Sequence, residues 1–258
     1  SMAFILPIEE PWTSQPQAAV GIDWSNPIAS KMSACAVPTN GVVLEFGRKY
    51  VETLGTQTGS GIKIKVGELG YGVDGSAFTT DVIRLHATAN ATNTAWEEPV
   101  QAATFLAFCV RFGDNYNGNA PIFGNQSTVQ APYSPWAIVD RGGTGGFGVE
   151  CSAGGTVRTF DIAAGLSNNT PMVLVGRYDG AKLESFRDGV KSSGSTACSG
   201  SLVYPTLQRG PAIGNFYDFT GSGRSFNGQT YLVALWPIAL SDVEIKNLSG
   251  NPWQLFAP

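Results

Sequence analysis

The stretch GRYDGAKLESFRDGV, residues 176–190, decides the fold class. Two Asp-Gly steps, Asp179-Gly180 and Asp188-Gly189, bracket the short segment AKLESFR. Glycine accepts the positive φ that a tight turn requires, so an Asp-Gly step between apolar runs is a strong signal for a β-hairpin. The stretch therefore predicts an antiparallel hairpin over residues 172–187.

The composition extends this β pattern to the whole chain. The sequence has 258 residues, of which 43% are hydrophobic and 14% are charged, with 32 glycines and 15 prolines. Such a chain can bury one sizeable core, and its turn-rich composition is typical of a β protein. The segment QAATFLAFCVRF, residues 101–112, is largely apolar on both faces and predicts a central strand. We expect a single all-β domain whose strands are mainly antiparallel.

The end of the chain predicts one short helix in the segment ALWPIALSDVEIKNLSGNPWQLF, residues 234–256. Ser241 is a good N-cap, and Glu244 three positions later completes a capping box. Gly250 can supply the left-handed residue that ends a helix. These signals predict a helix over residues 242–249.

Together with FNGQTYLVALWPIALSDVEIKNL, residues 226–248, the hairpin resembles the laminin-G and concanavalin A-like superfamily. The resemblance implies a jelly-roll sandwich of two antiparallel sheets. One departure is that Ser185 and Arg187 stand where the family usually has apolar residues, which leaves open which face of that strand is buried. We divide the chain into an extended arm containing proline and tryptophan (1–40), the sandwich (41–250) and a C-terminal tail (251–258).

The two flanks resemble the ends of laminin-G-like proteins of tailed bacteriophages and prophages. They are PWTSQPQAAVGIDWSNPIA, residues 11–29, and NPWQLF, residues 251–256. The resemblance implies a non-enzymatic virion component, a head-decoration or tail-associated protein made in the bacterial host cytoplasm, whose partners are other virion proteins or further copies of itself. Aromatic residues near both ends are interface candidates, because buried aromatics dominate interface energetics: Trp12, Trp24, Trp253 and Phe256.

These aromatic residues have an alternative role, which is to pack on their own sandwich. In either case we expect the two aromatic ends of the chain to lie on the same side of the molecule.

The competing function is that of a carbohydrate-binding module or an adhesin for surface polysaccharide. Predicted loops place aromatic rings, which can stack on sugars, beside amides and carboxylates. The alternative is that such loop aromatics cap the ends of the core. The glycan-binding candidates are Tyr116, Tyr133, Trp136, Asp140, Tyr217 and Asp218.

A polysaccharide-degrading enzyme is a third hypothesis, and the sequence contains little that supports it. Retaining glucanases of this superfamily carry E-x-D on one strand, which places two carboxylates on the same face. No E-x-D occurs here, and the adjacent pairs Glu9-Glu10 and Glu97-Glu98 would diverge on a strand. His86 is the only histidine, so a structural role is expected for it. We assign no catalytic residue.

Calcium is the one cofactor that the sequence suggests, because a hard cation prefers oxygen ligands. The loop GDNYNGNAP offers Asp114, Asn115, Asn117 and Asn119, although Asn-Gly-rich loops are also plain turns.

The net charge is −4 and the sequence has no run of basic residues. We therefore expect no binding to nucleic acid or to an anionic membrane. We find no apolar run long enough for a membrane span and no signal-peptide core, so we expect a soluble protein. The four cysteines stand far apart and form no C-x-x-C pair. They are either buried thiols or, in a secreted protein, two disulfides.

Overall fold

The structure is a computed structural model of the 258-residue chain. It describes residues 15, 21–39, 42–47, 50–54, 56–58, 63–67, 69–75, 82–85, 96, 99–113, 119–127, 131–142, 146–162, 166–205, 211–216 and 225–256.

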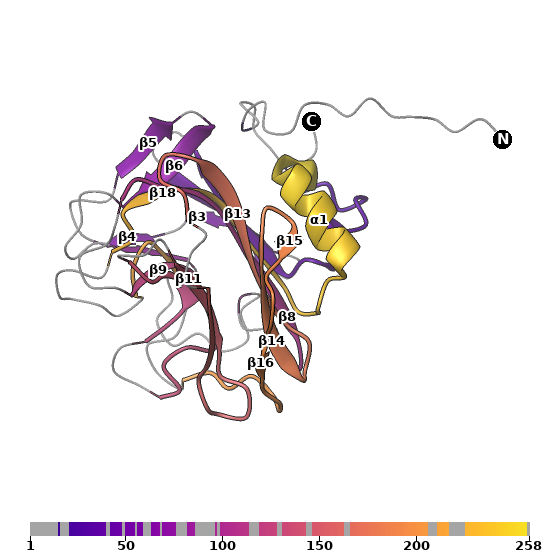
Figure 1. The fold of residues 1–258 in the computed structure, drawn as a ribbon. Coiled ribbons are helices and arrows are strands. Elements are labelled where there is room, and N and C mark those ends of the chain that lie inside the picture. The colour runs from indigo at the N-terminus through magenta and orange to yellow at the C-terminus, as the bar shows by residue number, and fades with distance from the viewer. Residues whose placement is uncertain are drawn as a thin grey trace.

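Two antiparallel sheets pack face to face and form the predicted jelly-roll sandwich (Figure 1). The large sheet contains β1 (Ala34–Thr39), β2 (Val42–Gly47), β3 (Tyr50–Leu54), β5 (Lys63–Gly67), β6 (Gly70–Asp74), β8 (Ala103–Arg111), β13 (Pro171–Tyr178), β14 (Lys182–Arg187), β15 (Val190–Lys191), β16 (Thr196–Ala197) and β18 (Gly228–Trp236). Its strand order is β15-β14-β13-β8-β18-β1-β2-β3, with β6 paired to β18, β5 to β6, and β16 to β14.

The small sheet has the order β12-β11-β10-β9-β17-β7-β4. Its strands are β4 (Thr56–Thr58), β7 (Val82–Arg84), β9 (Ala120–Asn125), β10 (Trp136–Asp140), β11 (Phe147–Cys151), β12 (Arg158–Ile162) and β17 (Pro211–Ile213). The helical elements are η1 (Ala29–Lys31), α1 (Asp242–Gly250) and η3 (Pro252–Leu255). Among the residues that the structure describes, no helix is long and apolar enough to cross a membrane.

The hairpin predicted over residues 172–187 is confirmed as β13 and β14, which pair from Tyr178↔Leu183 to Leu174↔Arg187. The turn of this hairpin and the next turn, between β14 and β15, use the expected backbone, since Gly180 and Gly189 both have positive φ. The strand predicted to be central is β8, whose residues are all buried and which lies between β13 and β18.

Alternation along β14 shows how the departures from the family pattern are accommodated. Leu183 faces the core between the sheets, whereas Phe186 packs on the outer face of the large sheet. Ser185 is also buried, and its hydroxyl lies 3.0 Å from the hydroxyl of Ser192. Both faces of β14 are therefore covered over most of its length.

The described interior between the sheets is mostly apolar, and one buried ion pair joins the two sheets. Arg111 at the end of β8 donates from Nε to Asp140 Oδ2 on β10 at 2.9 Å, and both side chains are almost completely buried. Arg111 also donates to Asn168, and Asp140 accepts from the backbone N–H of Gly142. A buried ion pair requires such additional hydrogen bonds, because two charges lose their hydration on burial.

The outer face of the large sheet is covered by the two ends of the described chain. In Figure 1 the yellow helix α1 lies along the outer side of the sheet, with the indigo segment that precedes β1 beside it. Ile22 and Phe256 form an antiparallel bridge, and the N–H of Asp23 donates to Leu255 O at 2.9 Å. The expectation that the two ends lie on the same side is confirmed for these residues.

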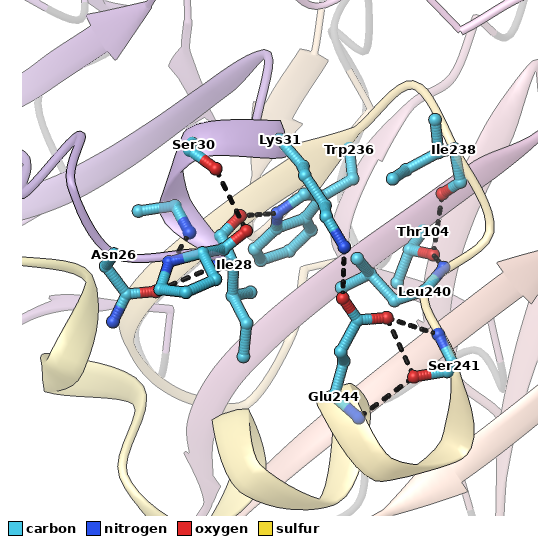
Figure 2. Close-up of polar contacts among 12 residues, drawn as sticks. Asn26, Ile28, Ser30, Lys31, Thr104, Trp236, Ile238, Leu240, Ser241 and Glu244 are labelled. Atoms are coloured by element: carbon cyan, nitrogen blue, oxygen red, sulfur yellow. Dashed lines mark hydrogen bonds and ion pairs between the residues drawn. The ribbon is translucent and has the colours of Figure 1, made fainter.

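Polar contacts fix this cover to the sheet, as Figure 2 shows. Trp236 Nε1 of β18 donates to Ile28 O at 2.9 Å, and Lys31 forms an ion pair with Glu244 of α1. Thr104 Oγ1 of β8 accepts from the N–H of Leu240, directly before the helix. Each segment of the cover is thus bonded either to the sheet or to the other segment.

Helix α1 begins as predicted, with a complete capping box between Ser241 and Glu244. The predicted left-handed end at Gly250 is wrong, because Gly250 is the last helical residue and Asn251 is the C-cap. The Gln254 side chain donates to the carbonyl oxygens of Asn247 and Asn251 at 2.9 and 2.8 Å. These bonds satisfy carbonyl groups that a glycine motif would otherwise satisfy.

The assignment of residues 1–40 to an arm is wrong for its last part. Strand β1, Ala34–Thr39, lies inside the large sheet between β18 and β2. Pro38 is tolerated there because it lies beyond Ala36, the last residue of β1 that pairs with β18. The carbonyl of Pro38 instead accepts a hydrogen bond from the Gln15 side chain.

Candidate functional site

A β-bulge in β18 creates the most developed pocket of the described chain. Thr230 pairs with Cys109 of β8 and Leu232 pairs with Phe108, so Tyr231 is the extra residue of the bulge. The bulge turns Tyr231 and Leu232 toward the same outer face of the sheet. Bulges re-aim side chains in this way and are common next to functional sites.

At the same point β18 changes its second neighbour. Residues 233–235 pair with β1, whereas Gln229 and Thr230 pair with β6. Gln15 bridges the place where β1 and β6 separate, since its side chain contacts Pro38 of β1 and accepts from the N–H of Tyr71 of β6 at 2.6 Å. The β5–β6 hairpin is thereby fixed as a wall beside the bulge.

The resulting pocket, here called the bulge pocket, has a volume of about 340 Å³. This size lies within the range of small-molecule sites. It is lined by Lys65, Val66, Gly67, Asp74, Val110, Phe112, Asn169, Gln229 and Tyr231.

The floor of the pocket combines an aromatic ring with an amide. Tyr231 Oη donates to Gln229 Oε1 at 2.7 Å, and the Tyr231 ring packs against Phe108 with 5.5 Å between the ring centroids. A Cβ added to Gly67 would lie 2.3 Å from Tyr231 Oη and 2.4 Å from Gln229 Oε1. A larger residue at position 67 would therefore displace the ends of these two side chains.

The wall and rim add charge and exposed apolar surface. Lys65 of β5 forms an ion pair with the buried carboxylate of Asp74, while its side chain stays about half exposed. Phe112, 38% exposed, follows β8 and is held by a hydrogen bond from its N–H to Asn227 O. Asn169 has a φ of 55°, and its N–H donates to Arg111 O at 2.6 Å. The pocket thus offers aromatic, amide and ionic groups within one concave surface.

Two of the glycan-binding candidates belong to the core, which corrects the sequence analysis. Trp136 is completely buried between Phe105 and Phe123, with centroid distances of 5.8 and 5.0 Å. Asp140 is the partner of Arg111 in the ion pair between the sheets. Both are on the inner face because residues 136, 138 and 140 alternate inward along β10.

Of the other glycan-binding candidates, the structure describes only Tyr133. Tyr133 is 52% exposed in the loop before β10, and it is not among the residues that line the bulge pocket. Tyr116, Tyr217 and Asp218 lie outside the described residues.

Among the interface candidates, Trp253 and Phe256 pack on their own sheet. They are 8% and 7% exposed, and their rings contact Phe108 and Phe46. The alternative that the sequence left open therefore holds for both of them. Trp24 is 41% exposed, and Trp12 lies outside the described residues.

Of the four predicted calcium ligands, the structure describes only Asn119, whose Oδ1 accepts from Arg141 Nη1 at 2.7 Å. An arginine bound to that oxygen takes the place that a cation would need. Asp114, Asn115 and Asn117 lie outside the described residues. Within the described part of the chain, no group of three His, Cys, Asp or Glu side chains could hold a metal ion.

Two carboxylates that are separated in sequence meet on the outer face of the small sheet. Arg141 donates to Glu150 Oε1 from Nη2 at 2.9 Å and to Asp161 Oδ1 from Nε at 2.6 Å. Gln126 also donates to Glu150. Since one guanidinium binds both carboxylates, the cluster is arranged as an ion-pair network between β11 and β12.

The remaining candidates for catalysis are not described. His86, the Glu9-Glu10 pair and the Glu97-Glu98 pair lie outside the described residues.

Comparison with known proteins finds structures of similar fold but assigns the chain to no family. No family model matches the chain, and no curated protein matches it. A Trypanosoma rangeli sialidase in complex with sialic acid matches with a TM-score of 0.56 and 12% identity, over 85% of this chain and 33% of the sialidase. The binding domain of Paraclostridial Mosquitocidal Protein 1 matches with a TM-score of 0.56 and 11% identity, over 86% of this chain and 52% of that domain.

A carbohydrate-binding module of a Ruminococcus gnavus sialidase, bound to α2,3-sialyllactose, has a TM-score of 0.46 and 12% identity, with 67% of this chain and 99% of the module covered. The chain spans about a third of the first sialidase and about half of the toxin domain. For the sialidase and the mosquitocidal-protein domain, which have TM-scores above 0.5, the likeness shows a shared fold.

Proposed function

We propose that this domain binds carbohydrate in the bulge pocket and carries out no chemistry of its own. The observation that supports the proposal is the combination of an aromatic floor with amide and ionic side chains in one pocket of about 340 Å³. Sugars present both apolar C–H faces and hydroxyl groups, so a site for them needs both kinds of surface.

The lining residues suit these two tasks. The ring of Phe112, which is 38% exposed, provides apolar surface on which a pyranose can stack, while Tyr231, 1% exposed, forms part of the pocket floor. Gln229, Asn169 and Lys65 supply amide and ammonium groups for sugar hydroxyls. Most of these residues stand on or next to paired strands, so little conformational entropy would be lost on binding.

The absence of catalysis is part of the proposal. Glycoside hydrolysis normally uses two carboxyl groups on either side of the scissile bond. Among the described residues that line the bulge pocket, Asp74 carries the one carboxylate, and Lys65 binds it. Glu150 and Asp161 lie near each other elsewhere, but Arg141 forms an ion pair with both of them.

A glycan array probed with the full chain tests the proposal, and sialylated glycans belong on it because a protein of similar fold was solved with sialic acid. We expect binding that Phe112→Ala and Gln229→Ala weaken by about tenfold or more, with Tyr133→Ala as the matched control on an exposed aromatic outside the pocket. Absence of binding to every glycan on the array, or equal affinity of all three variants, would refute a glycan site in the pocket.

A second candidate function is protein contact within a phage particle, which the resemblance of the flanks implies. The observation that favours it is Trp24, which stays 41% exposed beside the C-terminal segment. If this residue anchors self-association, Trp24→Ala will shift the protein to a smaller species in sedimentation velocity. A wild-type chain that sediments as a monomer at all concentrations would remove self-association.

A further inference from the structure

Two of the four cysteines lie in contact inside the sandwich. Cys151 ends β11 and Cys198 follows β16, and their Sγ atoms are 3.9 Å apart. Both side chains belong to the core between the sheets. A disulfide bond is about 2.05 Å long, so the sulfur atoms need to approach by about 1.9 Å, within the reach of side-chain rotation.

Hydrogen bonds hold the two backbone segments beside each other. Ala153 and Leu202 form an antiparallel bridge, the N–H of Gly154 donates to Ser201 O at 2.9 Å, and Ser152 Oγ donates to Val203 O at 2.7 Å. These contacts follow Cys151 directly. The segment after Cys198 is therefore aligned with the end of β11 without help from the sulfur atoms.

A second set of bonds positions Cys198 itself. Its N–H donates to Ala181 O at 3.0 Å, and Tyr178 Oη donates to Gly200 O at 2.6 Å. Both partners belong to the β13–β14 hairpin or its turn. Cys198 is thus fixed from the large sheet and Cys151 from the small sheet, so a bond between them would link the two sheets covalently.

The other two cysteines are excluded as partners of each other by the sheet. Cys35 packs on the outer face of the large sheet, whereas Cys109 packs on the inner face. The sequence left open either four thiols or two disulfides, and the two-disulfide pattern is incompatible with this arrangement.

We propose that Cys151 and Cys198 are a disulfide-forming pair that joins β11 to the segment after β16, while Cys35 and Cys109 remain thiols. The oxidant is a small-molecule disulfide such as oxidised glutathione. One cysteine thiolate attacks it, forms a mixed disulfide and releases one thiol. The second cysteine then attacks the protein sulfur of the mixed disulfide, which forms the Cys151–Cys198 bond and releases the second thiol. Two protein thiols are oxidised, one small disulfide is reduced, and the two protons pass to the released thiolates.

Burial determines when this exchange can take place. Loss of hydration, together with the neighbouring Cys198, raises the pKa of Cys151 to about 12, and burial also raises the pKa of Cys198. The reactive thiolate is therefore scarce in the folded protein. The bond forms during folding or transient opening of the 198–203 segment, and once formed it is shielded from reductant.

The test is to unfold the full chain in urea and refold it in a buffer of oxidised and reduced glutathione, with a parallel sample in reductant. We expect two of the four thiols to be lost, and peptide mapping to join the peptides that contain Cys151 and Cys198. The oxidised form should melt about 5–10 °C above the reduced form, because the bond constrains the unfolded chain. Cys198→Ser should abolish both effects and leave three titratable thiols.

Two results would overturn the proposal. One is four titratable thiols after refolding in oxidised glutathione, and the other is a bond that maps to Cys35 or Cys109. Mapping of the wild-type chain decides the matter even if Cys198→Ser fails to fold. Because no readout involves a glycan, failure here is distinguishable from failure of the carbohydrate proposal.

Discussion

The outer face of the large sheet has two halves that share strands but differ in what covers them. Over the covered half, segments 22–32 and 240–256 lie on the large sheet and bury most of their apolar side chains against it. Over the open half, β18 continues past its bulge and, with the β5–β6 hairpin, forms the bulge pocket. The two halves differ in the side chains that the strands present.

The side chains that β18 presents in the two halves bear on where we propose that a ligand binds. In the covered half, β18 presents Leu232, Ala234 and Trp236 to the cover. In the open half it presents Gln229 and Tyr231, which bond to each other. The two groups satisfy each other although both side chains are almost completely buried. The open half thus carries polar groups where the covered half is apolar, which is why we propose it as the ligand site.

The largest expected effect is on the covered half, from Trp253→Ala. Trp253 packs against Phe108 and Phe256 with centroid distances of 5.6 and 6.2 Å. Its loss leaves a cavity over the sheet, and we expect the free energy of unfolding to fall by about 3–5 kcal/mol. Urea unfolding measures this, with the exposed Trp24→Ala as the matched control at within about 0.5 kcal/mol. Equal effects of the two variants would contradict the division into two halves.

The second-largest expected effect concerns the network of ion pairs at the start of α1. Arg177 donates to Glu184 Oε2 from Nε and Nη2, and from Nη1 to Leu240 O at 2.8 Å, directly before the helix. Lys182 and Lys191 also bind the Glu184 carboxylate. We expect Glu184→Gln to lower the free energy of unfolding by about 2–3 kcal/mol at pH 7, because it removes the buried carboxylate that three cations share and leaves Arg177 with only the exposed Asp242 as an ion-pair partner.

The same residue predicts the direction of the acid dependence. Burial raises the pKa of Glu184, but hydrogen bonds from Lys191, Lys182 and Arg177 outweigh it and lower the pKa to about 2, against 4.5 for an ordinary glutamate. The native state thus favours the ionised form. Its contribution is fully present above about pH 4.5 and is lost as the pH falls toward 2.

Unfolding measured across this pH range should therefore show a shallower loss of stability in Glu184→Gln than in the wild type. Glu244, whose pKa a hydrogen bond from Lys31 lowers to about 2, remains in the variant, so part of the acid dependence should persist. Parallel curves for variant and wild type would refute the role assigned to Glu184.

The parts of the fold that follow local rules were predictable. The Asp-Gly turns placed the β13–β14 hairpin, and the spacing of Ser241 and Glu244 placed the start of α1. Alternation also held a signal that was not used. Asp140 shares a face with apolar residues of β10, which indicates a buried partner, and Arg111 at the end of the apolar β8 is that partner.

The bulge pocket could not be predicted in the same way. Its walls come from β5, β6, β8 and β18, which are distant in sequence, and the segment GQTYLVALW reads as an ordinary strand. The bulge at Tyr231 depends on how β18 pairs with β8 and β6, which is a property of the sheet. Composition likewise could not decide whether Trp253 would contact its own sheet or a partner.

The variant Gly67→Ala tests the open half, because it changes the floor of the bulge pocket. The added Cβ would meet Tyr231 Oη and Gln229 Oε1, which are the ends of side chains that can shift. Their displacement fills the pocket floor, so we expect the affinity for a glycan identified on the array to fall about tenfold, or about 1.4 kcal/mol. Gly21→Ala is the matched control, because a Cβ there has no heavy atom within 4 Å. Calorimetry that finds equal affinity for both variants would exclude the pocket.

The smallest expected effect is that of Ser241→Ala at the start of α1. Ser241 Oγ accepts from the N–H of Glu244 at 3.3 Å, and the Glu244 carboxylate accepts from the N–H of Ser241 at 2.8 Å. Removing the hydroxyl should lower the free energy of unfolding by about 1 kcal/mol, as for other N-caps. Because the helix belongs to the covered half, glycan affinity should stay unchanged. A loss of affinity in Ser241→Ala would mean that the two halves are coupled through β18, and the pocket could no longer be treated as a site independent of its cover.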